Sequence, residues 1–339
     1  MMRVGVTGYG YWGPNLVRNF HEFADTEVRM VCDRDDTRLK KVKQKYPEIP
    51  VCSDFSEMIN NPDIDIIAIA TPVSTHYELA LAALNMGKHV WIEKPITHHA
   101  EQAEHLIEVA RENGLTLFVD HTFVYTGAVR KIKELIDEGV IGDVYYYDSV
   151  RINLGLFQHD ISVVWDLAVH DLSILDYTLH PAITQVSCTG MSHVPNEPAN
   201  IAYMTLYGND HLICHIHVNW LAPAKVRKTL FGGSKKMIVY DDLEPSEKIK
   251  IYDKGIAVNG ERDKDKLHDI IQYRRTGDVL IPYVDVSEAL QKGVAHFIQC
   301  INEKKEPITN GEAGLRIVKI LEAGSISKQN HGAPVDVNL

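Results

Sequence analysis

A glycine-rich turn between an apolar run and a helical pattern constrains this chain more than any other feature. The run Val4–Thr7 is followed by Gly-Tyr-Gly-Tyr-Trp-Gly, and a helical pattern starts at Pro14. In a G-x-G-x-x-G turn the glycines allow a tight turn, a close approach of backbone to a pyrophosphate, and close helix–strand packing. The helix that follows directs free N–H groups at the phosphates. The sequence therefore predicts a dinucleotide site, formed by Gly8, Gly10, Tyr11, Trp12 and Gly13.

Alternation of apolar runs with amphipathic helices continues to about Asp120. The predicted strands are Val4–Thr7, Val28–Cys32, Ile64–Thr71, His89–Ile92 and Leu115–Val119. The predicted helices between them are Pro14–Ala24, Thr37–Tyr46, His76–Met86 and His98–Asn113. Near-continuous apolar strands separated by helices are typical of a parallel, doubly wound sheet. The analysis predicts an α/β protein with an N-terminal, NAD-binding Rossmann domain over residues 1–122.

The pattern of predicted helices and strands changes after His121. Helices are expected at Thr126–Glu138 and Asp166–Leu179, and at Ser287–Lys304 and Glu312–Gln329 near the end of the chain. Strand-like runs cluster between them at Val144–Leu154, Gln185–Gly190, Ile201–Tyr207, His211–Trp220, Val226–Phe231 and Met237–Tyr240. Strands without intervening helices favour an antiparallel sheet. Residues 123–339 are therefore predicted to form an α+β domain with an open, mostly antiparallel sheet that binds substrate and forms oligomers, and the polar segment Asn259–Gly277 is expected at the surface.

Composition excludes several function classes. A length of 339 residues favours two domains, and 35 basic against 46 acidic residues give a net charge of −11, which argues against a nucleic-acid surface. No apolar run is long enough to cross a membrane. Five cysteines without a C-x-x-C spacing indicate a reducing, cytoplasmic location. His215 and His217 alternate along one strand without a cysteine or carboxylate to complete a ligand set, so no metal site is predicted.

Further residues are expected to bind the dinucleotide. Asp33 closes the second strand about 20 residues after the glycine turn, where a carboxylate binds ribose hydroxyls and repels a 2′-phosphate. This favours NAD over NADP, although Arg34 beside it could instead meet such a phosphate. Residues after the next strand are expected to line the nicotinamide end: Thr71, Pro72, Ser74 and His76. Ser74 could equally cap the following helix.

Glu93-Lys94-Pro95 ends the strand His89–Ile92 at the same carboxyl edge of the sheet. Repulsion from a bound, positively charged nicotinamide would favour the neutral amine of Lys94, which could then take a proton from a substrate hydroxyl. Farther along, Asp166 and His170 stand four residues apart and share one helix face. An imidazole titrates near neutral pH and suits the same task. Read without further context, such a pair could also be a solvent-exposed helix pair.

Together these motifs resemble the Gfo/Idh/MocA family of sugar and cyclitol oxidoreductases, over essentially the whole chain. The motif D-x-x-x-H of that family matches Asp166-Leu-Ala-Val-His170. The resemblance implies a Rossmann domain followed by an open-sheet substrate domain. It also implies that Glu93 and Lys94 lie at the cofactor, that Lys94 and His170 handle the proton, and that Asp166 orients His170.

Several stretches resemble the branch of nucleotide-sugar 3-dehydrogenases that act on UDP-N-acetylglucosamine or its uronate. They are Gly8–Arg18, His121-Thr-Phe, Arg151–Gln158, Trp165–Leu175 and Gly277–Pro282. The resemblance implies oxidation at C3 by NAD, a partner aminotransferase that builds amino sugars for surface polysaccharides, and a homo-tetramer or homo-dimer. Asp120 departs from the branch, where a small residue is expected, and puts the local pocket shape in doubt.

Six residues are expected to contact the substrate. Those before or at the start of the catalytic helix could bind sugar hydroxyls or a carboxylate: Arg151, Asn153, Gln158 and Trp165. Lys225 and Arg227 could reach a diphosphate, or could simply protect a sheet edge from pairing. Three alternatives stay open: a dehydrogenase of a free sugar or cyclitol such as inositol, an NAD-dependent glycosidase, and a non-enzymatic regulator that senses NAD or sugar nucleotides.

Overall fold

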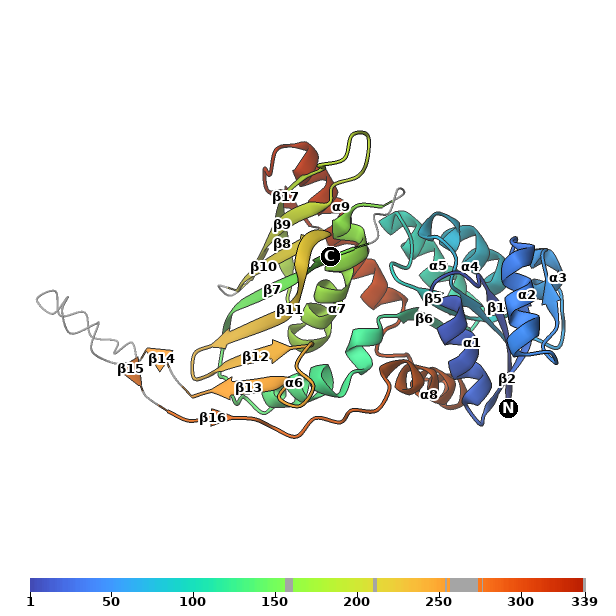
Figure 1. The fold of residues 1–339 in the computed structure, drawn as a ribbon, viewed down its shortest axis with the longest axis horizontal. Coiled ribbons are helices and arrows are strands. Elements are labelled where there is room, and N and C mark those ends of the chain that lie inside the picture. Colours follow the sequence, from blue (N-terminus) through green and yellow to red (C-terminus); the bar gives the residue numbers. More distant parts are fainter. Residues whose placement is uncertain (156–160, 210–211, 254, 257–273, 276, 338–339) are drawn as a thin grey trace, which may run out of the picture. The chain divides into compact units, whose positions relative to one another are not determined.

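A computed structural model describes residues 1–155, 161–209, 212–253, 255–256, 274–275 and 277–337 (Figure 1). The chain forms two compact units. The first comprises Met1–Thr126 and Ser287–Glu322, and the second comprises Gly127–Val286 and Ala323–Leu339. The sequence analysis instead divided the chain once, at residue 122. The segment 259–277, apart from residues 274, 275 and 277, lies outside the described residues.

The first unit contains a six-stranded parallel sheet of strand order β3-β2-β1-β4-β5-β6. Its strands are β1 (Met2–Thr7), β2 (Thr26–Cys32), β3 (Val51–Cys52), β4 (Ile66–Ile69), β5 (His89–Glu93) and β6 (Leu117–Asp120). Its helices are α1 (Gly13–Glu22), α2 (Asp36–Lys45), α3 (Phe55–Ile59), α4 (His76–Asn85), α5 (Ala100–Glu112) and α8 (Ala289–Glu303). The strand order reverses between β1 and β4, which is where such folds bind ligands. The predicted Rossmann sheet is confirmed.

An aromatic cluster explains why α8 belongs to this unit although it follows the second one in sequence. Trp91 on β5 is fully buried, and its ring stacks on Phe118 of β6 at 4.1 Å. Phe20 from α1 and Phe297 from α8 make edge-to-face contacts with the Trp91 ring, with ring centroids 5.4 and 5.6 Å from it. Burial of each such side chain contributes about 1.5–3 kcal/mol. The helix is therefore held by contacts that its distance along the sequence conceals.

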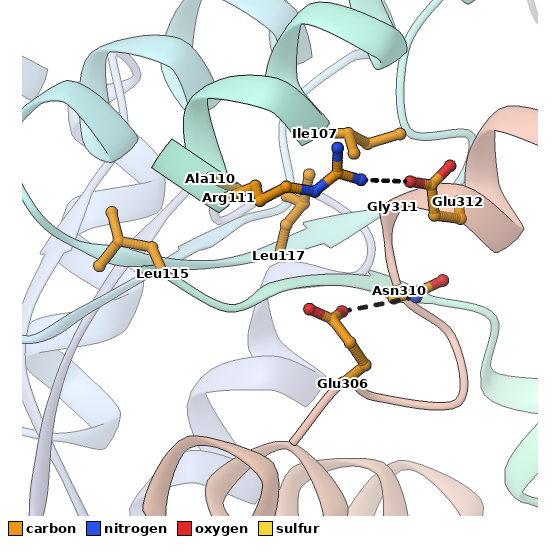
Figure 2. Close-up of a pocket in the computed structure, with 9 residues that line it drawn as sticks. All are labelled: Ile107, Ala110, Arg111, Leu115, Leu117, Glu306, Asn310, Gly311 and Glu312. Atoms are coloured by element: carbon orange, nitrogen blue, oxygen red, sulfur yellow. Dashed lines mark hydrogen bonds and ion pairs between the residues drawn. The ribbon is translucent and has the colours of Figure 1, made fainter. Parts of the chain in front are cut away.

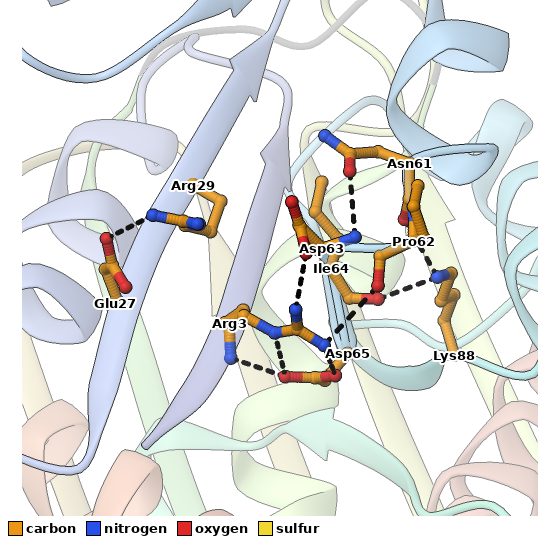
Figure 3. A network of polar contacts seen from close by, with 9 residues as sticks. All are labelled: Arg3, Glu27, Arg29, Asn61, Pro62, Asp63, Ile64, Asp65 and Lys88. Atoms are coloured by element: carbon orange, nitrogen blue, oxygen red, sulfur yellow. Dashed lines mark hydrogen bonds and ion pairs between the residues drawn. The ribbon is translucent and has the colours of Figure 1, made fainter.

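A polar network ties the amino ends of β1 and β4 together (Figure 3). The Arg3 guanidinium donates two hydrogen bonds to the Asp65 carboxylate, at 2.9 and 2.7 Å, and another to Asp63 at 2.8 Å, while the Arg3 backbone N–H donates to Asp65 at 2.9 Å. Lys88 donates to the carbonyl oxygens of Asn61 and Ile64, at 3.0 and 2.7 Å. Ligands of open α/β sheets bind at the opposite, carboxyl ends of the strands. This network therefore stabilises the sheet and lies away from the predicted site.

The second unit contains a nine-stranded sheet of order β16-β13-β12-β11-β7-β10-β9-β8-β17. Its strands are β7 (Val144–Leu154), β8 (Ile183–Met191), β9 (Ile201–Gly208), β10 (Ile213–Asn219), β11 (Leu221–Gly233), β12 (Met237–Asp241), β13 (Ile249–Tyr252), β16 (Val279–Leu280) and β17 (Val335–Asp336). A separate pair joins β14 (Gly255–Ile256) to β15 (Arg274–Arg275). Of the named neighbours only β7 and β10 run parallel. The predicted open, mostly antiparallel sheet is confirmed.

Helices cover one face of this sheet and leave part of the other exposed. The helices are α6 (Gly127–Asp137), α7 (Val169–Leu179), which a π-helical turn at Val164–Ala168 precedes, and α9 (Gly311–Gln329), in which the division between the units falls. Tyr147 on β7 is buried and donates to the backbone carbonyl of Asp171 in α7 at 2.9 Å. Opposite-facing neighbours across β7, β10 and β9 are exposed by 37–46%: Tyr146, Ile213, Tyr207 and Tyr203. None of the helices within the described ranges is both long and apolar enough to cross a membrane.

Candidate cofactor and catalytic site

The turn between β1 and α1 has the geometry that a pyrophosphate needs. Gly8 has a φ of +90°, and a Cβ on it would lie 2.6 Å from the carbonyl oxygen of Ala70. A Cβ on Gly13 would lie 2.1 Å from the carbonyl oxygen of Gly8, whereas one on Gly10 would meet only Arg38, at 3.6 Å. Tyr11 is exposed, and no side chain caps the α1 N-terminus at Trp12. The backbone N–H groups here are therefore available to phosphate oxygens.

Asp33 lies beside this turn and is 7% exposed. Its carboxylate accepts hydrogen bonds from the backbone N–H groups of Tyr9 at 2.6 Å and Asp35 at 2.9 Å. Arg38 places its Nη1 3.3 Å from the same carboxylate, while Arg34 is exposed. Arg38, which the sequence did not single out, reaches back from the first turn of α2. An arginine five residues beyond Asp33 therefore lies on the carboxylate of the predicted ribose site.

The loop after β4 carries the residues predicted to line the nicotinamide end, of which one, His76, is buried. Thr71 accepts a hydrogen bond from the Thr75 hydroxyl at 2.7 Å, and Pro72 and Ser74 are exposed. His76 is buried, and its ring nitrogens lie 2.9 Å from the carbonyl oxygens of Pro95 and Thr71. Burial lowers the pKa of His76 to about 4, so the ring is neutral. His76 thus ties the loops after β4 and β5 together, and its place beside the cofactor stays a prediction.

Four polar residues meet at the carboxyl ends of β5 and β6. Glu93 and Asp120 are direct cross-strand partners, and Lys94 and His121 follow them. Asp120 accepts hydrogen bonds from Trp12 Nε1 at 3.3 Å and from the Thr122 hydroxyl at 2.8 Å. The first of these bonds joins the glycine-rich turn to the edge of the sheet that carries Lys94. The presumed phosphate site and Lys94 therefore lie at one edge of one sheet.

His121 is a buried residue that the sequence did not single out as part of the site. It is 1% exposed, and neither ring nitrogen has a hydrogen-bond partner among the described residues. Burial, and after it the positive charges of Lys94 and Arg316, lower the pKa of His121 to about 3. The imidazole is therefore neutral.

In the second unit, Asp166 and His170 lie where the π-helical turn meets α7. Asp166 accepts a hydrogen bond from Trp220 Nε1 at 3.2 Å, and Trp165 donates to the Ser325 hydroxyl at 2.9 Å. His170 is half-buried in the first turn of α7, where its backbone carbonyl accepts from Ser173. Single π-helical turns occur frequently at functional sites. Trp220 holds the Asp166 carboxylate from β10–β11, a contact that sequence spacing does not reveal.

Two of the predicted substrate contacts are ion pairs within the unit. Arg151 is 3% exposed, and its Nε and Nη2 donate to the two carboxylate oxygens of Asp171 at 2.9 and 3.1 Å. Arg227 donates to Asp242 at 3.1 Å. Both arginines were predicted to bind sugar or diphosphate, but carboxylates of the same unit engage them. Lys225 is exposed, Asn153 is half-buried, and Gln158 lies outside the described residues.

A small hollow in the first unit is separate from all these residues (Figure 2). It has a volume of about 230 Å³ and is lined by Ile107, Ala110, Arg111, Leu115, Leu117, Glu306, Asn310, Gly311 and Glu312. Arg111 pairs with Glu312 across it at 2.9 Å. It contains no residue of the strand ends that carry Lys94. The described residues bring no three metal-ligating side chains together either.

Known protein families match both units. Residues 2–121 match the model described as "Oxidoreductase family, NAD-binding Rossmann fold", and residues 129–239 match the GFO/IDH/MocA C-terminal domain. The chain belongs to the Gfo/Idh/MocA oxidoreductase family. It is 39% identical over 265 residues to the uncharacterized oxidoreductase YdgJ of Escherichia coli K12, which covers 73% of each chain. The chain is thus an NAD-binding oxidoreductase, as the sequence analysis predicted.

More distant relatives cover nearly the full length. The scyllo-inositol 2-dehydrogenase (NADP(+)) IolW of Bacillus subtilis is 26% identical and covers 97% of this chain and 94% of its own. Among solved structures, UDP-N-acetylglucosamine 3-dehydrogenase GnnA from Acidithiobacillus ferrooxidans has a TM-score of 0.83 at 21% identity. It covers 98% of this chain and 99% of its own. The chain therefore shares its fold with this dehydrogenase over nearly its full length.

Proposed function

We propose that this chain is a sugar dehydrogenase that oxidises the C3 hydroxyl of a UDP-linked amino sugar with NAD, in the synthesis of surface-polysaccharide sugars. The hydrogen bond from Trp12 to Asp120 carries the proposal, since it brings the phosphate-binding turn to the end of β6, the neighbour of the strand β5 that Lys94 follows. The motifs shared with the nucleotide-sugar branch and the full-length likeness to GnnA support the substrate class.

Each residue has a role in this proposal. The N-terminus of α1 and the turn Gly8–Gly13 hold the pyrophosphate, and Asp33 accepts hydrogen bonds from the adenosine ribose. When bound, NAD supplies the hydride acceptor. Lys94 and His170 take up the proton of the sugar hydroxyl, and Asp166, held by Trp220, orients His170.

NAD is the proposed cofactor rather than NADP. Asp33 presents a buried negative charge where NADP would carry its 2′-phosphate, and like charges repel. Arg38 lies on the same carboxylate and opposes this effect, since a guanidinium binds phosphate well. Its pairing with Asp33 neutralises part of its charge. The two residues together favour NAD.

A free sugar or cyclitol is the second candidate substrate. The relationship to IolW over nearly the whole chain supports it. The pairing of Arg227 with Asp242 also engages one of the two basic residues predicted to reach a diphosphate, and Arg151, predicted to bind sugar hydroxyls or a carboxylate, pairs with Asp171. Lys225 remains exposed and could still contact a diphosphate.

A thermal-shift panel tests the substrate class. Ligands that bind only the folded state raise the unfolding midpoint by mass action. We expect NAD, and either UDP-N-acetylglucosamine or its uronate, to raise it, with NADP and scyllo-inositol giving little change. A shift with inositol and none with any UDP compound would replace the proposed substrate by a cyclitol. Net formation of NADH on a sugar nucleotide would separate the dehydrogenase from an NAD-dependent glycosidase and from a regulator.

The assembly is proposed to be a homo-tetramer or homo-dimer, and the pathway partner an aminotransferase. The exposed apolar residues Tyr146, Ile213, Tyr207 and Tyr203 on the open sheet support self-association. A Cβ on Gly232 would lie 2.0 Å from the Tyr146 ring, so glycine allows that ring to lie flat against the sheet. Light scattering should give a mass of two or four chains, and Ile213→Asp should lower it.

A further inference from the structure

The carboxyl groups of Glu93 and Asp120 form a buried pair that the proposed chemistry does not use. The two residues are register partners on neighbouring parallel strands, so their side chains leave the same face of the sheet. Asp120 is 1% exposed and Oε1 of Glu93 is buried, so the two carboxyl groups lie next to each other out of contact with solvent. Two carboxylates placed in this way repel each other, which favours a proton on one of them.

The surroundings decide which residue carries that proton. Asp120 accepts from Trp12 Nε1 and from the Thr122 hydroxyl, and both donors stabilise its anion. Oε1 of Glu93 is buried and has no hydrogen-bond partner within the described part of the chain. Burial raises the pKa of Glu93 well above its ordinary value, and the charge of Asp120 raises it further. Glu93 is therefore the acid and Asp120 the carboxylate.

The charged groups that face the pair come from three elements. Lys94 follows β5 and acts electrostatically on both carboxyl groups, favouring their ionised forms. His121 follows β6 and is neutral, and the positive charge of Arg316 contributes to the lowered pKa of that histidine. Trp12 and Thr122 contribute dipoles only. One positive charge, on Lys94, thus faces the one negative charge that a shared proton leaves on the pair.

We propose that Glu93 and Asp120 share a single proton and that the one negative charge left on the pair governs how readily the Lys94 ammonium releases its own proton. Both acids are then positioning residues for the base. The shared proton follows from the local geometry alone, whereas its effect on catalysis rests on the proposed function.

Isosteric amides separate charge from shape. Glu93→Gln keeps a donor to Asp120 and leaves the Asp120 charge in place. Asp120→Asn removes the repelling neighbour, so that Glu93 ionises and the pair again carries one charge. Only the double variant Glu93→Gln/Asp120→Asn is neutral. The matched control is Glu108→Gln, on the exposed surface of α5 in the same unit.

Two measurements test the proposal without a substrate. Infrared difference spectra at neutral pH should show a protonated carboxyl stretch that disappears in each single variant and persists in the Glu108→Gln protein. Competitive acylation of Lys94, followed by peptide mass spectrometry against pH, reports its proton directly. The titration midpoint should stay near that of the wild type in both single variants. It should fall by about one pH unit or more in the double variant, since an opposite charge has been removed.

The outcomes are distinct. A carboxyl stretch that survives Glu93→Gln, or is absent from the wild type, overturns the shared proton. A double variant whose Lys94 midpoint equals that of the single variants overturns the electrostatic role. With a substrate that the enzyme oxidises, the midpoint of the acidic limb of the kcat/KM pH profile should shift in the same direction as the titration midpoint of Lys94. If the proposed substrate is wrong, the infrared and acylation measurements still test the shared proton and its effect on Lys94.

Discussion

Substitution of Asp171 by asparagine should destabilise the second unit strongly, because it leaves a buried guanidinium without its counter-charge. Arg151 and Asp171 are 3% and 1% exposed, and two hydrogen bonds of 2.9 and 3.1 Å join them. Asp171 also accepts from the Ser149 hydroxyl at 2.8 Å. Asparagine keeps the shape of the side chain but removes the charge and turns one acceptor into a donor that faces Arg151.

Removal of one partner from a buried ion pair costs about 3–5 kcal/mol of unfolding free energy. The expected loss for Asp171→Asn lies in this range. The comparison variant is Asp148→Asn, on the neighbouring strand β7, where the carboxylate is 41% exposed and pairs with His215 at 3.2 Å. A pair as exposed as this one contributes about 0–1 kcal/mol. A difference of several kcal/mol should therefore separate two chemically identical changes.

Urea unfolding followed by tryptophan fluorescence measures this loss, because Trp165 and Trp220 both lie in the second unit. The double variant Arg151→Met/Asp171→Leu replaces both charges and should lose less stability than Asp171→Asn alone. If Asp171→Asn lost less than about 1 kcal/mol, the buried pair would not be structural in the sense argued here. An unchanged midpoint together with a large rise in KM would return Arg151 to the role of a substrate ligand.

Three further predictions concern the first unit and the proposed chemistry. Lys94→Met and His170→Asn should each lower kcat by about 10²- to 10⁴-fold, the usual contribution of a general base. Calorimetry should show that the NAD affinity of both variants stays within a few-fold of the wild type. A loss of NAD binding that matches the loss of kcat would contradict a role in proton transfer. Asp33→Ser should narrow the preference for NAD over NADP by about tenfold or more, equivalent to roughly 1.4 kcal/mol, and equal affinity ratios before and after substitution would show that Asp33 does not select the cofactor. His121 has a folded pKa of about 3, below the ordinary 6.5, so the unfolded chain binds more protons between these values and stability falls as pH falls through this window. The His121→Gln protein should lose less stability on acidification, with a slope smaller by about 1.4 kcal/mol per pH unit, and identical slopes in urea titrations between pH 6 and pH 4 would refute a buried neutral imidazole.

Local signals predicted most of the fold because they act within a few residues. The glycine turn, the Pro14 helix start and the alternation of Val144–Leu154 each report on their own segment, and the longer strands were found within a few residues of their ends. The short elements β3, α3, β13, β14, β15, β16 and β17 were missed, since two to five residues are too few to show a periodic pattern. The segment 287–322 packs with the first unit, where Phe297 lies against Trp91, and such a long-range contact leaves no local pattern in the sequence.

The site was harder to predict, because its residues are defined by partners distant in sequence. Arg151 reads as a free donor until Asp171 is placed beside it, 20 residues away. His76 reads as a ligand until its ring is found between two backbone carbonyls. Asp120 was noted only as a departure from the expected small residue, and its bond to Trp12 spans 108 positions. The roles of Lys94, Asp166 and His170 stay proposals.

Transfer of deuterium from the sugar to the cofactor is the most direct test of the account. UDP-N-acetylglucosamine or its uronate, labelled with deuterium at C3, would be incubated with the enzyme and NAD, and the reduced nicotinamide analysed by mass spectrometry. The account predicts that the label at C3 appears in the NADH, and that label at C4 does not. NADH formed without deuterium from C3, or formed only from a labelled inositol, would contradict it.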